Sequence, residues 1–159
     1  MEKLTEESAS KAPKLRQATD EDCLLLFRLQ HLNGDDLDAS DSEQVARYEQ
    51  YKNDFDGSKI QVIMSKGIVV GRLRIVRENS IYIGGFQILP QYRGLGIGTA
   101  VLSGLVVESE QTGMPITLEV FNDNTQAIDL YEKIGFVTTE ENDKQKTMRY
   151  EPSSVRISP

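Results

Sequence analysis

The sequence is poor in the residues that make disulfides and metal sites. It has one cysteine, one histidine and no apolar run long enough for a secretion signal or a membrane span. Cys23 has no partner for an internal disulfide, which fits a reducing compartment. No cluster of cysteine, histidine and carboxylate residues has metal-ligand spacing, so no metal cofactor is expected. With neither leader nor span, we expect a cytoplasmic protein with no membrane partner.

Positive charge is also scarce. There are 18 lysines and arginines against 25 aspartates and glutamates, which gives a formal net charge of -7 and a pI near 4.8. This balance argues against a nucleic-acid or anionic-membrane partner, both of which need clustered basic residues. It favours a cationic partner instead.

The length and composition suit one globular domain. The chain has 159 residues, of which 38% are hydrophobic and 27% charged, with no repeat or linker. We expect a domain over residues 14–151, a disordered tail over 1–13 and a second tail over 152–159. Hydrophobic periodicity and turn residues predict helices at about 23–32, 43–55, 97–112 and 125–134, and strands at about 14–17, 59–65, 68–77, 80–89, 116–120, 136–141 and 146–151. The fold class is therefore α/β, with a mixed, mostly antiparallel sheet of about six to seven strands and about four helices.

A glycine-rich run joins the fourth predicted strand to the third helix. It reads Pro90-Gln-Tyr-Arg-Gly-Leu-Gly-Ile-Gly-Thr99, with alternate glycines. Such a loop before a helix suits a phosphate, because backbone N–H groups can approach the ligand closely. Thr99-Ala100 follows Gly98 where a P-loop needs Lys-Ser or Lys-Thr, and the glycine spacing does not match a dinucleotide fingerprint. Taken alone, the run is equally compatible with a tight turn or close helix packing.

Two motifs in the right order resemble the GCN5-related N-acetyltransferase (GNAT) family. Arg93, Gly96 and Gly98 match its Arg/Gln-x-x-Gly-x-Gly pyrophosphate loop. Downstream, Leu118-Glu-Val120, Asn124, Ala127 and Leu130-Tyr-Glu-Lys-Ile-Gly-Phe136 resemble its second signature. The resemblance covers about residues 14–151 and implies the GNAT fold, with acetyl-CoA as cosubstrate. It also implies that the pantetheine arm lies between the strands at 80–89 and 116–120.

The resemblance further implies which residues bind the coenzyme. The backbone N–H of Ile88 would stabilise charge on the thioester carbonyl oxygen. Asn124 would contact the coenzyme arm, although it can equally be the N-cap of the following helix. The pyrophosphate would bind the loop residues Arg93, Gly94, Leu95, Gly96, Ile97, Gly98 and Thr99. Arg93 would screen charge while backbone N–H groups make most of the contact.

Tyr131 and Glu119 are the candidate catalytic residues. Tyr131 matches the family tyrosine that protonates the leaving thiolate; the alternative is a core aromatic residue with a solvated hydroxyl. Glu119 is the best general base, because residues 79–92 contain no carboxylate and strand alternation places it opposite Leu118 and Val120. A structural carboxylate, with water as the base, is the alternative. Gly84-Gly85 marks either a bulge or close packing under a neighbouring side chain.

The predicted function is transfer of an acetyl group from acetyl-CoA to a primary amine of a small cationic molecule, by direct attack in a ternary complex. A peptide N-terminus is the alternative acceptor, and a non-catalytic CoA-binding sensor is the alternative function. The acidic stretch 34–41 can steer a cation or be merely solvated. A homodimer is left open. Cys23 is expected in the core, and His31 at a helix end.

Overall fold

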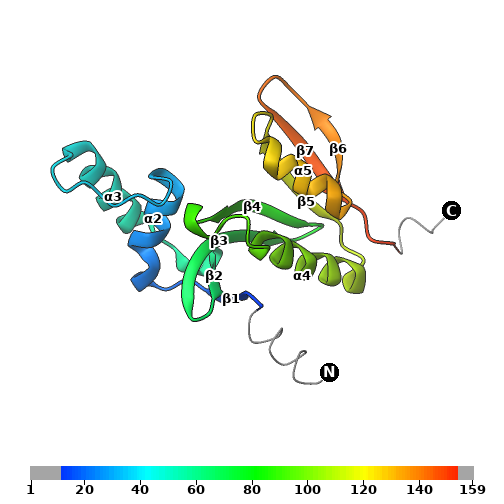
Figure 1. Cartoon of the computed structure of the whole chain (residues 1–159), viewed down its shortest axis with the longest axis horizontal. Helices are drawn as coiled ribbons and strands as arrows, with labels where there is room; N and C mark the ends of the chain where they lie inside the picture. The colour runs from blue at the N-terminus through cyan, green and yellow to red at the C-terminus, as the bar shows by residue number, and fades with distance from the viewer. Residues whose placement is uncertain (1–11, 154–159) are drawn as a thin grey trace. The chain divides into compact units, whose positions relative to one another are not determined.

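The computed structural model describes residues 12–153, which form two compact units (Figure 1). Within the described residues, the first comprises 12–74 and 85–97, and the second 75–84 and 98–153. The chain crosses between them three times, within the strands β3 (Ile68–Arg77) and β4 (Ile81–Ile88) and at the start of the helix α4 (Ile97–Thr112). The strand order of the sheet is β1-β2-β3-β4-β5-β7-β6. Each pair of strands is antiparallel where its register is known, except β4 and β5, which are parallel.

The first unit contains short antiparallel strands and two helices. Strand β2 pairs with β1 on one side and with β3 on the other, and places Val62 opposite Arg72. Besides its parts of β3 and β4, the unit consists of β1 (Lys14–Gln17), η1 (Asp20–Asp22), α2 (Cys23–His31), α3 (Ser42–Asp54), η2 (Gly57–Lys59), β2 (Gln61–Ser65) and η3 (Pro90–Tyr92). A buried cluster of Ala18, Leu26 and Val62 is covered by Tyr51, Phe55, Ile60, Met64 and Val69. Apolar side chains of both helices and the sheet therefore share one core.

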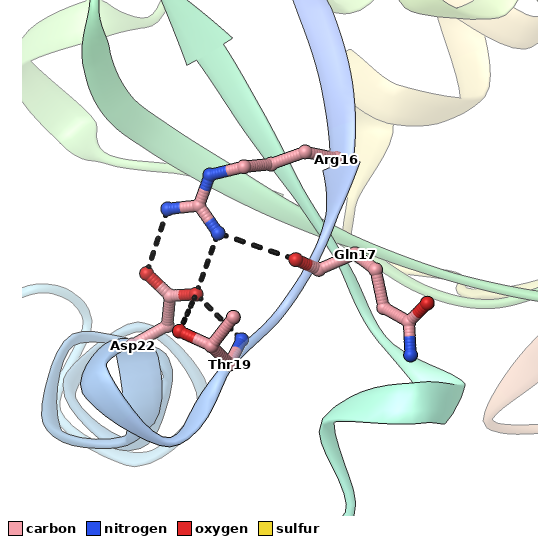
Figure 2. A network of polar contacts seen from close by, with 4 residues as sticks. All are labelled: Arg16, Gln17, Thr19 and Asp22. Atoms are coloured by element: carbon pink, nitrogen blue, oxygen red, sulfur yellow. Dashed lines mark hydrogen bonds and ion pairs between the residues drawn. The ribbon is translucent and has the colours of Figure 1, made fainter.

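A polar network fixes the start of α2 against β1 (Figure 2). The Asp22 carboxylate accepts two hydrogen bonds from the Arg16 guanidinium, at 2.8 and 3.0 Å, and one from the backbone N–H of Thr19 at 2.8 Å. Asp22 is buried, yet the Arg16 hydrogen bond lowers its pKa below the ordinary aspartate value despite the opposing effect of burial. The reciprocal Thr19–Asp22 contact is a capping box. It precedes α2 by one 3₁₀ turn, η1.

Asp22→Asn should lower the free energy of unfolding by about 1–2 kcal/mol at neutral pH, because an amide cannot accept all three hydrogen bonds. A depressed carboxylate pKa contributes stability above the unfolded value, and this contribution disappears as pH falls through the folded pKa. The difference in the free energy of unfolding between variant and parent should therefore shrink below about pH 3.9. Urea unfolding across this pH range measures it, with Asp20→Asn, an exposed neighbour, as the control. An equal gap at every pH would contradict the assignment.

The second unit packs two helices with the remaining strands. Helix α5 lies against the β5–β7–β6 part of the sheet (Figure 1). Besides its parts of β3 and β4, the unit consists of α4 (Ile97–Thr112), β5 (Ile116–Phe121), α5 (Thr125–Ile134), β6 (Val137–Glu141) and β7 (Gln145–Tyr150). The first residue of α4, Ile97, is assigned to the first unit. A bidentate ion pair joins Arg77 to Glu108 of α4 at 2.6 and 2.8 Å. The buried apolar face of α4 includes Val101, Leu102 and Leu105, as its periodicity predicts.

The predicted fold class is confirmed: an α/β chain with seven strands, mostly antiparallel, and four α-helices in residues 12–153. The helices 97–112 and 125–134 and the strands 14–17 and 68–77 match the predicted bounds, and the other predicted bounds differ by at most two residues. The short 3₁₀ turns were not predicted. Most of the two predicted tails, residues 1–11 and 154–159, lies outside the described residues.

Candidate active site

In the first unit, the glycine loop has the backbone conformation that its sequence requires. Gly94 and Gly96 have φ angles of 75° and 84°, in the left-handed region that favours glycine. No atom lies within 4 Å of the position that a Cβ would occupy on either residue, and Leu95 is 68% exposed. The loop backbone is therefore open to a ligand over several residues. This fits the predicted pyrophosphate of acetyl-CoA and disfavours close helix packing as the reason for these two glycines.

Arg93 links this loop to the end of β4. Its Nε donates to the carbonyl oxygen of Ile88 at 2.9 Å, and its Nη2 to Oδ1 of Asn33 at 3.2 Å. Ile88 itself is half-buried at the last position of β4. The guanidinium thus bonds the carbonyl of the same residue whose N–H is the predicted oxyanion donor. Arg93 thereby gains a structural role in addition to the predicted one toward phosphate.

Arg93→Ala should weaken binding of acetyl-CoA by about two- to fivefold, as expected for one exposed cation among several backbone donors. Calorimetric titration measures this change, and Lys59→Ala, which removes another exposed cation, serves as the control. A loss of more than about 100-fold would mean that Arg93, and not the loop backbone, makes the main contact.

In the second unit, the other predicted coenzyme residues occupy two helix N-termini. Gly98 and Thr99 lie in the first turn of α4. Asn124 is the N-cap of α5, and its Oδ1 accepts from the backbone N–H of Ala127 at 3.3 Å. The capping alternative for Asn124 is confirmed. Its contact with the coenzyme stays a prediction, and Asn124 is exposed enough for both roles.

Glu119 lies on the exposed face of β5, as strand alternation predicts. Leu118 and Val120 on either side are buried. Oε2 of Glu119 accepts a hydrogen bond from Nε2 of Gln145 on the paired strand β7 at 3.1 Å. This leaves the second carboxylate oxygen able to accept a proton.

Tyr131 is buried in α5, with only 8% of its surface exposed. Burial raises the pKa of its phenol, so the hydroxyl stays protonated throughout the neutral range. Its ring lies 5.5 Å from that of Phe136, which lies 5.8 Å from that of Tyr150. Tyr131 is therefore part of the core, as the structural alternative requires, and it also has the protonation state of a general acid.

Glu119 and Tyr131 lie on opposite faces of β5. Tyr150 pairs with Ile116 and so shares a face with Ile116 and Leu118. The row of rings from Tyr150 to Tyr131 lies on that face, whereas Glu119 points to the other one. The two side chains therefore do not face each other, and each would have to reach the reacting groups from its own side of β5.

The acidic segment between α2 and α3 uses several of its carboxylates locally. Asp38 accepts from the backbone and hydroxyl of Ser40, and Asp41 caps α3 through the N–H groups of Glu43 and Gln44. Asp36 forms an ion pair with Arg28 at 3.2 Å. These contacts explain part of the acidity as turn and cap chemistry.

Arg72 was not predicted from the sequence as a site residue. This arginine interrupts the apolar stretch Ile68-Val-Val-Gly-Arg-Leu73 of β3, and only 8% of its surface is exposed. A cation inside an apolar strand was the available signal. The structure also resolves the alternative at Gly85, where a Cβ would lie 2.8 Å from Nη2 of Arg72; close packing explains this glycine.

Cys23 is buried, and burial raises the pKa of its thiol, which agrees with the predicted core role. His31 lies in the last turn of α2 as predicted, where burial and then Arg72 lower its pKa.

The described residues contain no group of three or more metal-ligating side chains. None of the helices within residues 12–153 is both long and apolar enough to cross a membrane.

Comparisons with known proteins agree with these motifs. The model of the acetyltransferase (GNAT) family matches residues 26–136. Ard1 from Thermoplasma volcanium is 22% identical with a TM-score of 0.62 over 89% of this chain and 98% of its own. The paia N-acetyltransferase from Thermoplasma acidophilum, solved in complex with coenzyme A, is 15% identical with a TM-score of 0.62 over 88% and 99%. The yncA structure from Salmonella typhimurium, with its cofactor acetyl-CoA, is 17% identical with a TM-score of 0.57 over 87% and 93%. No curated protein matches the sequence.

Proposed function

This chain belongs to the GNAT acetyltransferase family and is an acetyl-CoA-dependent N-acetyltransferase, and on that basis we propose that it acetylates a primary amine of a small molecule by direct transfer. Acetyl-CoA supplies the activated acetyl group as a thioester. Direct transfer is supported by two groups of complementary chemistry in the second unit, the exposed carboxylate of Glu119 and the protonated phenol of Tyr131. No acyl-enzyme is needed, and the buried Cys23 thiol is a poor nucleophile.

Each residue has one task in the proposed reaction. Glu119 removes a proton from the acceptor ammonium or amine, directly or through water. The N–H of Ile88 donates to the thioester carbonyl oxygen, on which charge develops. Tyr131 gives its proton to the departing thiolate of coenzyme A and regains one from solvent. The backbone from Arg93 to Thr99 binds the pyrophosphate, supported by the open conformation at Gly94 and Gly96.

The proposed acceptor is a cationic amine, and the arguments for its positive charge differ in strength. The net charge of -7 supports the cationic amine predicted from sequence, whereas the local contacts of Asp36, Asp38 and Asp41 weaken the argument from the acidic segment. A peptide N-terminus remains the second acceptor, because it too is a primary amine. The single buried cysteine supports our proposal of a cytoplasmic location.

Calorimetry followed by a thiol-release assay tests the proposal. We expect purified protein to bind acetyl-CoA, and at saturation to release free thiol with one class in a panel of polyamines, aminoglycosides, amino acids and short peptides. A double-reciprocal pattern of intersecting lines would agree with a ternary complex. Parallel lines, or binding without thiol release from any amine, would contradict direct transfer to a small amine.

A further inference from the structure

Arg72 carries a buried charge without a carboxylate partner. Its Nε donates to Oε1 of Gln87 at 2.6 Å, but neither Nη1 nor Nη2 has a hydrogen bond to a described residue. None of the ion pairs among residues 12–153 includes it. Arginine is rarely buried unless it is paired, and it cannot avoid the cost by losing its proton. Neither Nη1 nor Nη2 is among the fully buried polar atoms without a partner, so both keep some exposure to solvent. The two terminal amino groups of Arg72 are therefore available to an anion that the described chain does not supply.

The backbone of β4 makes room for this guanidinium. A Cβ on Gly85 would lie 2.8 Å from Nη2, 3.2 Å from Cζ and 3.3 Å from Nη1 of Arg72. Real Cβ atoms essentially never lie within 3.0 Å of such an atom, so any other residue at position 85 would displace Nη2 of Arg72. Gly85 and Gln87 together hold Arg72 in one orientation, with Nη1 and Nη2 as the remaining donors.

Helices α2 and α3 contribute further polar groups to the same neighbourhood. The hydroxyl of Tyr51 is buried and has no hydrogen-bond partner. The ring of His31 meets that of Tyr51 edge-on at 5.9 Å. The charge of Arg72 acts on both side chains: it lowers the pKa of His31, as burial and Arg47 also do, and it opposes the effect of burial on the pKa of Tyr51. We call Arg72, Gln87, Tyr51 and His31 the Arg72 site.

The Arg72 site is adjacent to the predicted acetyl position. Gln87 immediately precedes Ile88, whose N–H is the proposed oxyanion donor, and consecutive Cα atoms are about 3.8 Å apart. Both residues, like the whole Arg72 site, belong to the first unit. The residue that holds the Arg72 guanidinium and the residue that offers the proposed oxyanion donor are thus neighbours in β4.

We propose that the Arg72 site binds a carboxylate of the acceptor, so that the substrate is a small, amino-acid-like molecule with both a primary amine and a carboxylate. This inference rests on the proposed function. Two parallel N–H donors of one guanidinium match the two oxygens of a carboxylate, and its single charge balances that of Arg72. The unpaired hydroxyl of Tyr51 gains an acceptor in the same way. A polyamine or aminoglycoside would instead meet a buried like charge.

Matched pairs of substrates test the inference. The parent protein is assayed with free amino acids and with their carboxamides, each at saturating acetyl-CoA. We expect kcat/KM to be about 100-fold higher for the free acids, because a carboxamide leaves the buried guanidinium without its anion. Arg72→Met should reduce this preference to about threefold or less, mainly through KM for the acid, with unchanged affinity for acetyl-CoA. Tyr51→Phe should reduce it partly.

Stability separates this role from a structural one. Arg72→Met removes an unpaired buried charge and should leave Tm unchanged or raised. Free amino acids at millimolar concentration should raise the Tm of the parent and not of Arg72→Met, a readout that needs no turnover. Arg74→Met, on the same strand, is the charge-matched control and should retain the preference.

The outcomes are distinguishable. Equal kcat/KM for acids and carboxamides in the parent, or a preference that survives in Arg72→Met, would overturn the inference while leaving the acetyltransferase intact. If Arg74→Met also loses the preference for free acids, the preference would arise from the overall positive charge of β3 and not from Arg72. This result would also overturn the inference. No thiol release with any amine, despite stabilisation of the parent by amino acids, would instead reject the proposed reaction and keep the carboxylate site.

Discussion

Tyr131→Phe should lower kcat at least about tenfold, because the departing thiolate then has no positioned proton donor. The affinity for acetyl-CoA should stay within about twofold of the parent, since the hydroxyl acts mainly in the transition state. The pKa of Tyr131 is raised by burial, so its ionisation should not reduce the parent's activity at any pH below about 10. Steady-state kinetics of thiol release, with calorimetry for the coenzyme, measure both quantities.

Tyr150→Phe is the matched control for this variant. Tyr150 is in the same row of rings as Tyr131, and its hydroxyl donates to Oε1 of Glu110 at 2.6 Å. Removing that hydroxyl should cost about 1 kcal/mol or more of stability and leave kcat close to the parent value. Unchanged turnover in Tyr131→Phe would remove the general-acid assignment and leave Tyr131 as a core residue only.

Glu119→Gln should lower kcat/KM by about 100-fold at pH values well below the pKa of the acceptor amine, where the free amine is scarce. The defect should shrink as pH rises, because more of the acceptor is then deprotonated without the help of the enzyme. The carboxylate of Glu119 is exposed, as this task requires, and glutamine keeps the size of the side chain and its ability to form hydrogen bonds. The measurement is a pH profile of kcat/KM for parent and variant on the same amine.

Glu140→Gln makes the same change of charge on an exposed residue of β6 and should leave the profile unaltered. A Glu119→Gln profile parallel to that of the parent at every pH would indicate that water deprotonates the amine. A defect shared by both variants would reflect the net negative charge of the unit and would contradict the specific role of Glu119.

Local residue chemistry was sufficient for the parts of the candidate site that lie within one element. Gly94 and Gly96 take up the left-handed conformation that only glycine adopts readily, so the loop was predictable from its glycines. Asn124 caps α5, and Glu119 alternates with buried neighbours, because both features depend on residues at most four positions away. The order of helices and strands follows from the same short-range periodicity.

The Arg72 site was not predictable, because each of its contacts joins residues that are distant in the sequence. Arg72 and Gln87 are 15 positions apart, and Tyr51 belongs to a different helix from His31. The two glycines at 84 and 85 left a bulge and close packing equally open until the guanidinium was found against Gly85. Whether a charged side chain is buried and unpaired is a property of its neighbours in space, which the pairing of strands determines.

By itself, the sequence determined the family, the coenzyme motif and the two candidate catalytic residues, because motif spacing and alternation are local and survive in the linear order. Only the tertiary structure decided that Arg72 is buried without an anion next to the strand end at Ile88. Burial and charge pairing depend on how strands and helices that are distant in the sequence pack together. The groups that select an acceptor are therefore determined by the tertiary structure.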